Sequence, residues 1–167
     1  KETRVAPEAL GREREIGRGL ASQNIALALV ARARTDPSRV AVLLPDGQEC
    51  GKGSEAKNHL RPTYGELDQR SDTLAAGLAS IGIVRGTRTV LMVRPGLDFF
   101  ALVFALFKAG AVPVVVDPGM GMRSLKKCLD EARPEAFIGV PLAHAARVLL
   151  GWARPTVKTV VTTGRFR

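Results

Sequence analysis

Two short, nearly continuous apolar runs, at residues 89–93 and 112–116, constrain the fold of this chain most strongly. Neither run alternates apolar with polar residues, which is typical of strands covered on both faces of a parallel sheet. Residues 97–108, between them, are apolar nearly all round and predict a helix that is buried on most sides. The chain must therefore build a sheet with helices packed against it.

A capped helix precedes the first run. Thr63 and Glu66 have the spacing of a capping box, in which the hydroxyl and the carboxylate each bind a free backbone amide. Apolar residues then recur at helical spacing, and Gly82 with Ile83 is typical of a helix end. We therefore expect a helix from residue 63 to about residue 81.

Helices and strands alternate over the rest of the chain. A third helix is expected at residues 123–132 and a fourth at 141–150, with strands at 136–140 and 158–162. Strict alternation with short connections predicts an α/β fold, a mostly parallel sheet flanked by helices.

The first 60 residues are less regular. Residues 1–20 mix acids, bases and glycines, and we expect a charged, loosely ordered leader. Asn24 can cap a helix over residues 25–34, residues 40–44 read as a strand with a turn at 45–47, and residues 48–60 as a loop.

The net charge of +9 raises the question of a nucleic-acid partner. The basic residues are scattered, 18 arginines against 7 lysines, so a solvated arginine-rich surface is the better interpretation and no nucleic-acid partner is expected. No apolar run reaches the roughly 18 residues of a transmembrane span, and residues 1–19 lack a signal-peptide core, which favours the cytoplasm. Cys50 and Cys128 are expected as reduced thiols.

Several patterns imitate ligand sites. Residues 47–53 resemble a phosphate-binding P-loop, but the glycine spacing is short and Gly53 stands where Ser or Thr must reach magnesium. Gly119, Gly121 and Ser124 imitate a dinucleotide fingerprint without its third glycine, so a tight strand-to-helix turn is favoured over a Rossmann nucleotide site.

Single residues can also imitate ligand sites. Asp117 follows a strand, where α/β sheets bind ligands, but a turn residue before Pro118 is the favoured interpretation. His59 and His144 have no partner at metal-ligand spacing and are expected on a surface or helix face. The phenylalanines of residues 97–108 could line an acyl pocket, but a buried core is favoured.

The middle of the chain resembles the adenylate-forming (AMP-binding) superfamily. Thr63-Tyr64-Gly65-Glu66-Leu67 is similar to its first core motif region, and the next helix follows the pattern S-x-x-L-A-x-x-L-x-x-x-G from Ser71 to Gly82. The run L-F-K-A-G-A-V-P-V-V-V-D-P at residues 106–118 resembles that superfamily's helix, strand and Asp-Pro. Residues 117–121 and 135–152 resemble the olefin-biosynthesis β-lactone synthetases in particular.

The resemblance implies an AMP-forming ligase that uses ATP and Mg to activate a long-chain carboxylic acid as acyl-adenylate. The adenylate would go to CoA, to a carrier or to a β-lactone. Residues 21–167 would form an incomplete N-terminal portion of the ligase domain, whose partner is the remainder of its own polypeptide.

The superfamily's phosphate loop does not occur in these residues, and Thr162-Thr163-Gly164-Arg165 echoes only a fragment of it. No catalytic, cofactor-binding or metal-binding residue is therefore assigned, and residues 1–167 alone are expected to be inactive and to hold neither ATP nor Mg. The alternative is a non-catalytic binding or scaffold module derived from this fold.

Overall fold

The computed structural model describes residues 24–45, 59–116, 119 and 121–164. The prediction of an α/β fold with a parallel sheet and flanking helices is confirmed. None of the helices in these ranges is long and apolar enough to cross a membrane. The elements are α2 (Ala26–Thr35), β1 (Leu44–Pro45), β2 (His59–Leu60), α3 (Tyr64–Ser80), β3 (Arg88–Met92), α4 (Leu97–Lys108), β4 (Val112–Val115), α5 (Met122–Ala132), β5 (Ala136–Gly139), α6 (Pro141–Leu150) and β6 (Thr159–Thr162).

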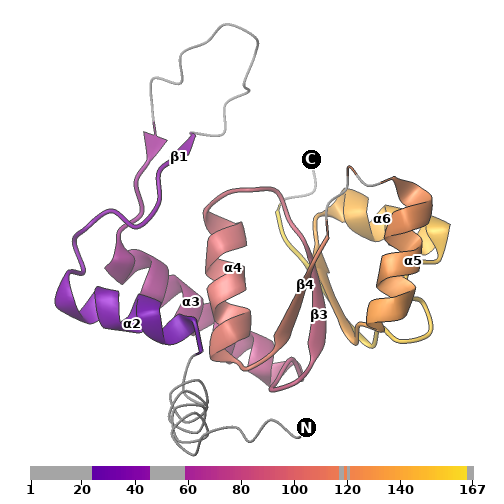
Figure 1. Ribbon diagram of the computed structural model, residues 1–167, viewed down its shortest axis with the longest axis horizontal. Coiled ribbons are helices and arrows are strands. Elements are labelled where there is room, and N and C mark those ends of the chain that lie inside the picture. Colours follow the sequence, from indigo (N-terminus) through magenta and orange to yellow (C-terminus); the bar gives the residue numbers. More distant parts are fainter. Residues whose placement is uncertain (1–23, 46–58, 117–118, 120, 165–167) are drawn as a thin grey trace, which may run out of the picture.

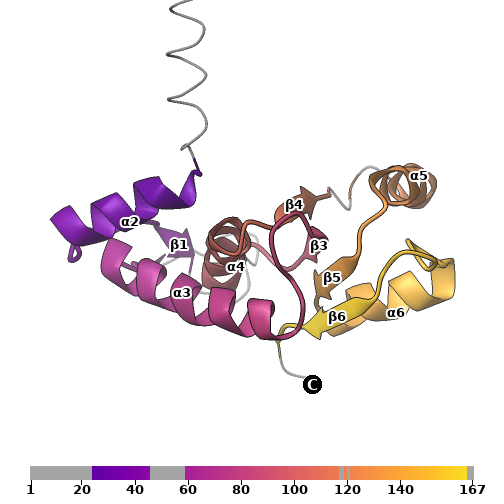
Figure 2. The same ribbon diagram turned by 90° about the horizontal axis from the view of Figure 1, so that it is seen from below.

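Four parallel strands form the main sheet in the order β4-β3-β5-β6. The chain moves from β3 outward to β4, then returns past β3 to β5 and continues to β6. Because parallel crossovers are right-handed, these opposite directions place α4 on one face and α5 and α6 on the other. Figures 1 and 2 show this arrangement, with α2 and α3 beside α4.

The two central strands supply both cores. Leu91 and Ile138 belong to the core under α3 and α4, whereas Val90 and Phe137 belong to the core under α5 and α6. Each of the four is at most 2% exposed. Burial of a large apolar side chain contributes about 1.5–3 kcal/mol, so both faces of β3 and β5 stabilise the fold.

Both ends of α3 follow the sequence prediction. Thr63 Oγ1 accepts a hydrogen bond from Glu66 N at 3.2 Å, and Glu66 Oε2 accepts from Thr63 N at 2.8 Å, which confirms the capping box. At the other end Gly82 has φ of 87°, and Ile83 N donates to Leu78 O at 2.9 Å. Ile83 is fully buried, so the helix end is closed hydrophobically as expected.

The prediction that residues 112–116 are covered on both faces is wrong. Val112 is 48% exposed and Val115 is 59% exposed, because β4 is an edge strand of the described sheet. The prediction for α4 needs a similar correction. Its small and branched residues Ala101, Leu102, Ala105 and Leu106 are buried, while its phenylalanines are only partly covered.

The N-terminal predictions are also corrected in detail. The helix begins at Ala26, and Asn24 Oδ1 accepts from Ala26 N at 3.0 Å. Asn24 also donates to Phe107 O at 2.6 Å, which connects α2 to the end of α4. The strand expected at 40–44 is reduced to β1 and a single bridge between Val40 and Thr63, since the chain there runs beside only two residues of β2. The leader, the turn at residue 46 and the loop to residue 58 lie outside the described residues.

A buried lysine joins α3 to α4. Lys108 Nζ donates to Asp68 Oδ1 at 2.5 Å, to Asp68 O at 3.0 Å and to Asp72 Oδ1 at 2.6 Å. The lysine side chain is 10% exposed, Asp68 is 19% exposed and Asp72 is 64% exposed. A charge this well covered needs its partners, because an uncompensated buried charge is costly.

We predict that Lys108→Met lowers the free energy of unfolding by about 2 kcal/mol, since methionine keeps the apolar stem but leaves Asp68 unpaired. Urea unfolding of the chain measures this change. Lys127→Met is the matched control, because Lys127 is 79% exposed and lies 3.9 Å from Glu131; it should change stability by less than about 0.5 kcal/mol. Equal effects of the two substitutions would contradict the prediction.

Candidate functional site

The direction of the chain reverses between β3 and β5. From β3 the connection leads to one side of the sheet, and from β5 it leads to the other, so the loops that follow these two strands diverge. In open α/β sheets ligands bind at such a point, outside the carboxyl ends of the strands. We therefore take this edge as the candidate site.

Three connections at this edge lie within the described residues. Residues 93–96 lead from β3 into α4, residue 140 leads from β5 into α6, and residues 163–164 follow β6. Val140 N donates to Met92 O at 3.1 Å and Thr163 N donates to Gly139 O at 2.9 Å, so the strands stay paired to their last residues. Arg94, whose side chain is exposed, lies in the first of these connections.

Gly139 lets α6 approach the end of β5 closely. A Cβ atom built on Gly139 would lie 2.8 Å from Phe137 Cε1, 3.2 Å from Ala143 Cβ and 3.3 Å from Met92 O. A side chain at this position would therefore push the helix, the strand or the Phe137 ring away. The glycine is needed because of this close packing, and its φ is not in the left-handed region.

His144 extends from α6 to the same edge. Its Nε2 atom lies 3.0 Å from Gly139 O and 3.0 Å from Val161 O, and its ring centroid lies 5.3 Å from that of Phe137. The histidine therefore contacts the last residue of β5 and the next-to-last residue of β6. The expectation of a helix-face residue is correct for its backbone position, but the side chain is half-buried rather than on the surface.

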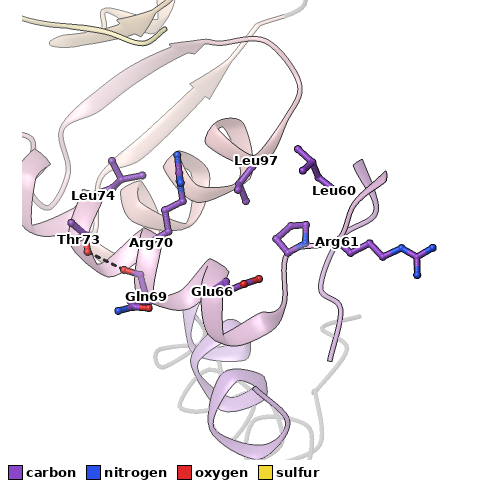
Figure 3. A pocket seen from close by; sticks show the side chains of 9 residues that line it. Leu60, Arg61, Glu66, Gln69, Arg70, Thr73, Leu74 and Leu97 are labelled. Atoms are coloured by element: carbon purple, nitrogen blue, oxygen red, sulfur yellow. Dashed lines mark hydrogen bonds between the residues drawn. The ribbon is translucent and has the colours of Figure 1, made fainter. Parts of the chain in front are cut away.

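A cavity of about 780 Å³ lies elsewhere, between β2, α3 and the beginning of α4 (Figure 3). Of its charged residues, Glu66 and Arg70 are engaged in the fold, and the side chain of Arg61 is exposed and extends away from the other lining residues. Glu66 caps α3, and Arg70 Nη2 pairs with Asp98 Oδ1 at 2.5 Å. The topology of the sheet, rather than this cavity, identifies the candidate site. The cavity is lined by Leu60, Arg61, Pro62, Glu66, Gln69, Arg70, Thr73, Leu74 and Leu97.

The residues weighed from the sequence do not come together. Gly121, with φ of 84°, forms the turn just before α5, and Ser124 is exposed on that helix. Thr162 and Thr163 lie at the end of β6. Asp117, residues 47–53, Cys50 and Arg165 lie outside the described residues, as does the side chain of His59, while Cys128 is exposed on α5.

Two groups were missed by the sequence analysis, the Lys108 network and the contacts of His144. A lysine at the end of an otherwise apolar helix is a usable signal for the first, because a buried ammonium group requires carboxylate partners. No comparable signal existed for His144, since its acceptors are backbone carbonyls. In the part of the chain that is described, no group of three His, Cys, Asp or Glu residues could hold a metal ion.

Comparison with known proteins identifies the family to which this frame belongs. Residues 24–166 match the family described as AMP-binding enzyme. The chain belongs to the AMP-binding enzyme family. This confirms the resemblance to adenylate-forming enzymes that was based on residues 63–118.

Two relatives of this AMP-binding chain are olefin beta-lactone synthetases. The protein from Stenotrophomonas maltophilia (strain K279a) is 56% identical over 142 residues, which cover 85% of this chain and 25% of that protein. The protein from Xanthomonas campestris pv. campestris is 54% identical over 143 residues, 86% of this chain and 25% of that protein. The chain thus spans about a quarter of the length of these relatives, and they belong to the branch suggested by residues 117–121 and 135–152.

Solved structures show the same fold. The apo structure of MbtA from Mycobacterium smegmatis has a TM-score of 0.70 and 28% identity, and the match covers 92% of this chain and 28% of that one. The inhibitor-bound N-terminal domain of FACL13 from Mycobacterium tuberculosis has a TM-score of 0.69 and 20% identity, and the match covers 84% of this chain and 33% of that one.

We predict that Gly139→Ala destabilises this AMP-binding chain by about 1–3 kcal/mol, because the added methyl group overlaps the Phe137 ring and α6. Chemical denaturation measures the change. Gly77→Ala is the control: a Cβ there meets nothing within 4 Å, and the residue lies inside α3, so alanine should stabilise by about 0.5–1 kcal/mol. A neutral Gly139→Ala would show that α6 does not pack this closely.

Proposed function

We propose that the chain is the N-terminal part of an ATP-dependent acyl-acid ligase that activates a fatty or β-hydroxy fatty acid as acyl-adenylate, of the β-lactone synthetase type. The observation that carries the proposal is the identity of 56% and 54%, over 85% and 86% of the chain, with two olefin beta-lactone synthetases. An identity of more than half, over 142 and 143 of the 167 residues, extends well beyond a single motif.

In the proposed reaction a carboxylate oxygen of the fatty acid attacks the α-phosphorus of ATP. The bond from that phosphorus to the bridging oxygen breaks, and pyrophosphate leaves with the electron pair. For a β-hydroxy acid the β-hydroxyl oxygen then attacks the acyl carbon, its proton is lost and AMP leaves, which closes the β-lactone. The protein would contribute positioning and electrostatic stabilisation of the transferring groups.

The described residues supply the frame of such a site rather than its chemical groups. Arg94 and the backbone at the ends of β3, β5 and β6 lie at the candidate edge, and the described residues hold no cluster of three His, Cys, Asp or Glu residues for Mg. We propose that ATP and Mg are held by the whole enzyme and that residues 1–167 alone hold neither. Since ATP is the proposed substrate, we expect the enzyme in the cytoplasm.

The remainder of the polypeptide is the proposed partner of this segment. Residues 21–167 would then be an incomplete N-terminal portion of the ligase domain, preceded by a charged leader at residues 1–20. Exposed apolar side chains on α6 support this division, because soluble surfaces rarely present such groups together. Leu142 is 77% exposed, Val148 is 62% exposed and Leu149 is 83% exposed.

The branch within the family is decided by the product. An acyl-CoA synthetase would release a thioester only when CoA is present, whereas a β-lactone synthetase would release the lactone and AMP without CoA. Mass spectrometry of reactions with a long-chain β-hydroxy acid separates the two. A non-catalytic scaffold derived from this fold would give neither product.

We predict that a polypeptide in which residues 1–167 are continued to the length of the relatives catalyses ATP–pyrophosphate exchange that depends on a long-chain β-hydroxy acid. Residues 1–167 alone should give no exchange above the background of a reaction without enzyme, because the phosphate-binding loop is missing from them. ATP–pyrophosphate exchange by residues 1–167 alone would contradict the proposal that they form an incomplete portion of the ligase domain. A longer polypeptide that is inactive with fatty and β-hydroxy fatty acids alike would instead favour the scaffold.

A further inference from the structure

His144 makes a contact that the proposed function does not yet use. It lies on the first turns of α6, yet its Nε2 atom is 3.0 Å from the carbonyl oxygens of Gly139 and Val161, on two different strands. Gly139 O also accepts the last ladder hydrogen bond between β5 and β6, from Thr163 N at 2.9 Å. One imidazole nitrogen thus lies where the two strands reach the candidate edge.

The surroundings of the ring determine where its proton lies. Carbonyl oxygens only accept hydrogen bonds, so Nε2 must carry hydrogen and donate to one oxygen or share the bond between both. The neutral form therefore has its proton on Nε2 and a lone pair on Nδ1, which is buried with no partner within the described residues. The histidine thus acts as a clamp in a defined sense: its Nε2–H group joins helix α6 to the backbone carbonyls of β5 and β6.

The ring is held in this orientation by its packing. It lies tilted against Phe137 at 56°, and the guanidinium carbon of Arg147 lies 5.8 Å from the centroid of the same phenylalanine ring. Gly139 permits the close approach of α6 that brings Nε2 within reach of the strands. Helix, glycine and aromatic ring together define the position of one N–H group.

The segment after β6 begins next to these contacts. Thr163 follows the last strand residue, and Gly164, with φ of 89°, turns the chain there. His144 contacts both carbonyls that bound this exit, Val161 O within β6 and Gly139 O opposite it. Loss of the N–H group would leave Val161 O without the contact and loosen the end of β6 against β5.

We infer that His144 is a positioning residue: by donating from Nε2 to Gly139 O and Val161 O it fixes the exit of β6 at the sheet edge where the acyl-acid ligase binds its reactants. This inference rests on the proposed function for its effect on the reaction, while the clamp itself stands on the geometry alone. A misplacement of about 1 Å at such an edge can lower a reaction rate by about two orders of magnitude.

Two substitutions by amide side chains test whether the hydrogen-bond donor at the Nε2 position, rather than the bulk of the imidazole ring, is required. In His144→Gln the side-chain amide nitrogen reaches the position of Nε2, whereas in His144→Asn it stops at the position of Nδ1, one atom short. Ala145→Asn, on the exposed neighbouring residue, controls for the lower helix propensity of asparagine. The longer polypeptide is assayed by acid-dependent ATP–pyrophosphate exchange, by NMR of the imidazole and by amide hydrogen exchange.

We expect NMR to show the proton of the neutral imidazole on Nε2. His144→Asn should lower kcat for exchange about tenfold or more and speed hydrogen exchange of the Thr163 amide by a similar factor. His144→Gln and Ala145→Asn should stay within about threefold of the unsubstituted protein in both measurements. This selective rescue by glutamine is not expected if the ring merely fills space.

A neutral imidazole with its proton on Nδ1, equal losses in the Gln and Asn variants, or unchanged values in both would each overturn the inference. If the unsubstituted longer polypeptide gives no exchange with any long-chain acid, the proposed function fails instead. The tautomer and the protection of the Thr163 amide then still decide whether His144 clamps the two strands.

Discussion

The burial of β3 and β5 on both faces is the constraint on which the rest of the fold depends. Val90 and Phe137 point to one core while Leu91 and Ile138 point to the other, and all four are almost completely buried. Two parallel strands of this kind require helices on both sides and crossovers that change direction between them. The same change of direction creates the divergent loops of the candidate edge, so the packing of the core and the place of the site have one cause.

Local signals in the sequence were sufficient for most of the elements. The helix of residues 97–108 and the helix of residues 141–150 have the predicted bounds, and β3 differs by one residue at each end. These elements are specified by caps, prolines and periodicity within a few neighbouring residues. The burial of residues 112–116 was not predictable in this way. A β-branched run looks the same in a central strand and at an edge, and only the strand order distinguishes them.

The candidate site was less accessible to sequence reasoning than the fold. The place of the site could be expected from the rule for α/β sheets, once alternation predicted a parallel sheet. The contacts of His144 could not be expected from the sequence, because its acceptors are one carbonyl 5 residues away and another 17 residues away. Backbone carbonyls occur at every position, so no residue type in the sequence marks the partner. Lys108 reaches 36 and 40 residues back, but there the partners are carboxylates, which leave a visible pattern.

The motif that carries the family resemblance is explained by the corner between α4 and β4. Lys108 pairs α4 with α3. Gly110 turns the chain with φ of 71°, and a Cβ atom built on it would lie only 3.3 Å from Arg85 Cβ and Cγ. Gly110 O also accepts from Gly86 N at 2.9 Å, and Ala111 is 6% exposed. Lys108, Gly110 and Ala111 of the Lys-Ala-Gly-Ala motif thus each have a geometric reason, and none of them lies at the carboxyl edge of the sheet. A family can therefore be recognised from residues that only shape the sheet and its helices. The activity still depends on chemical groups that the sheet and helices hold in position.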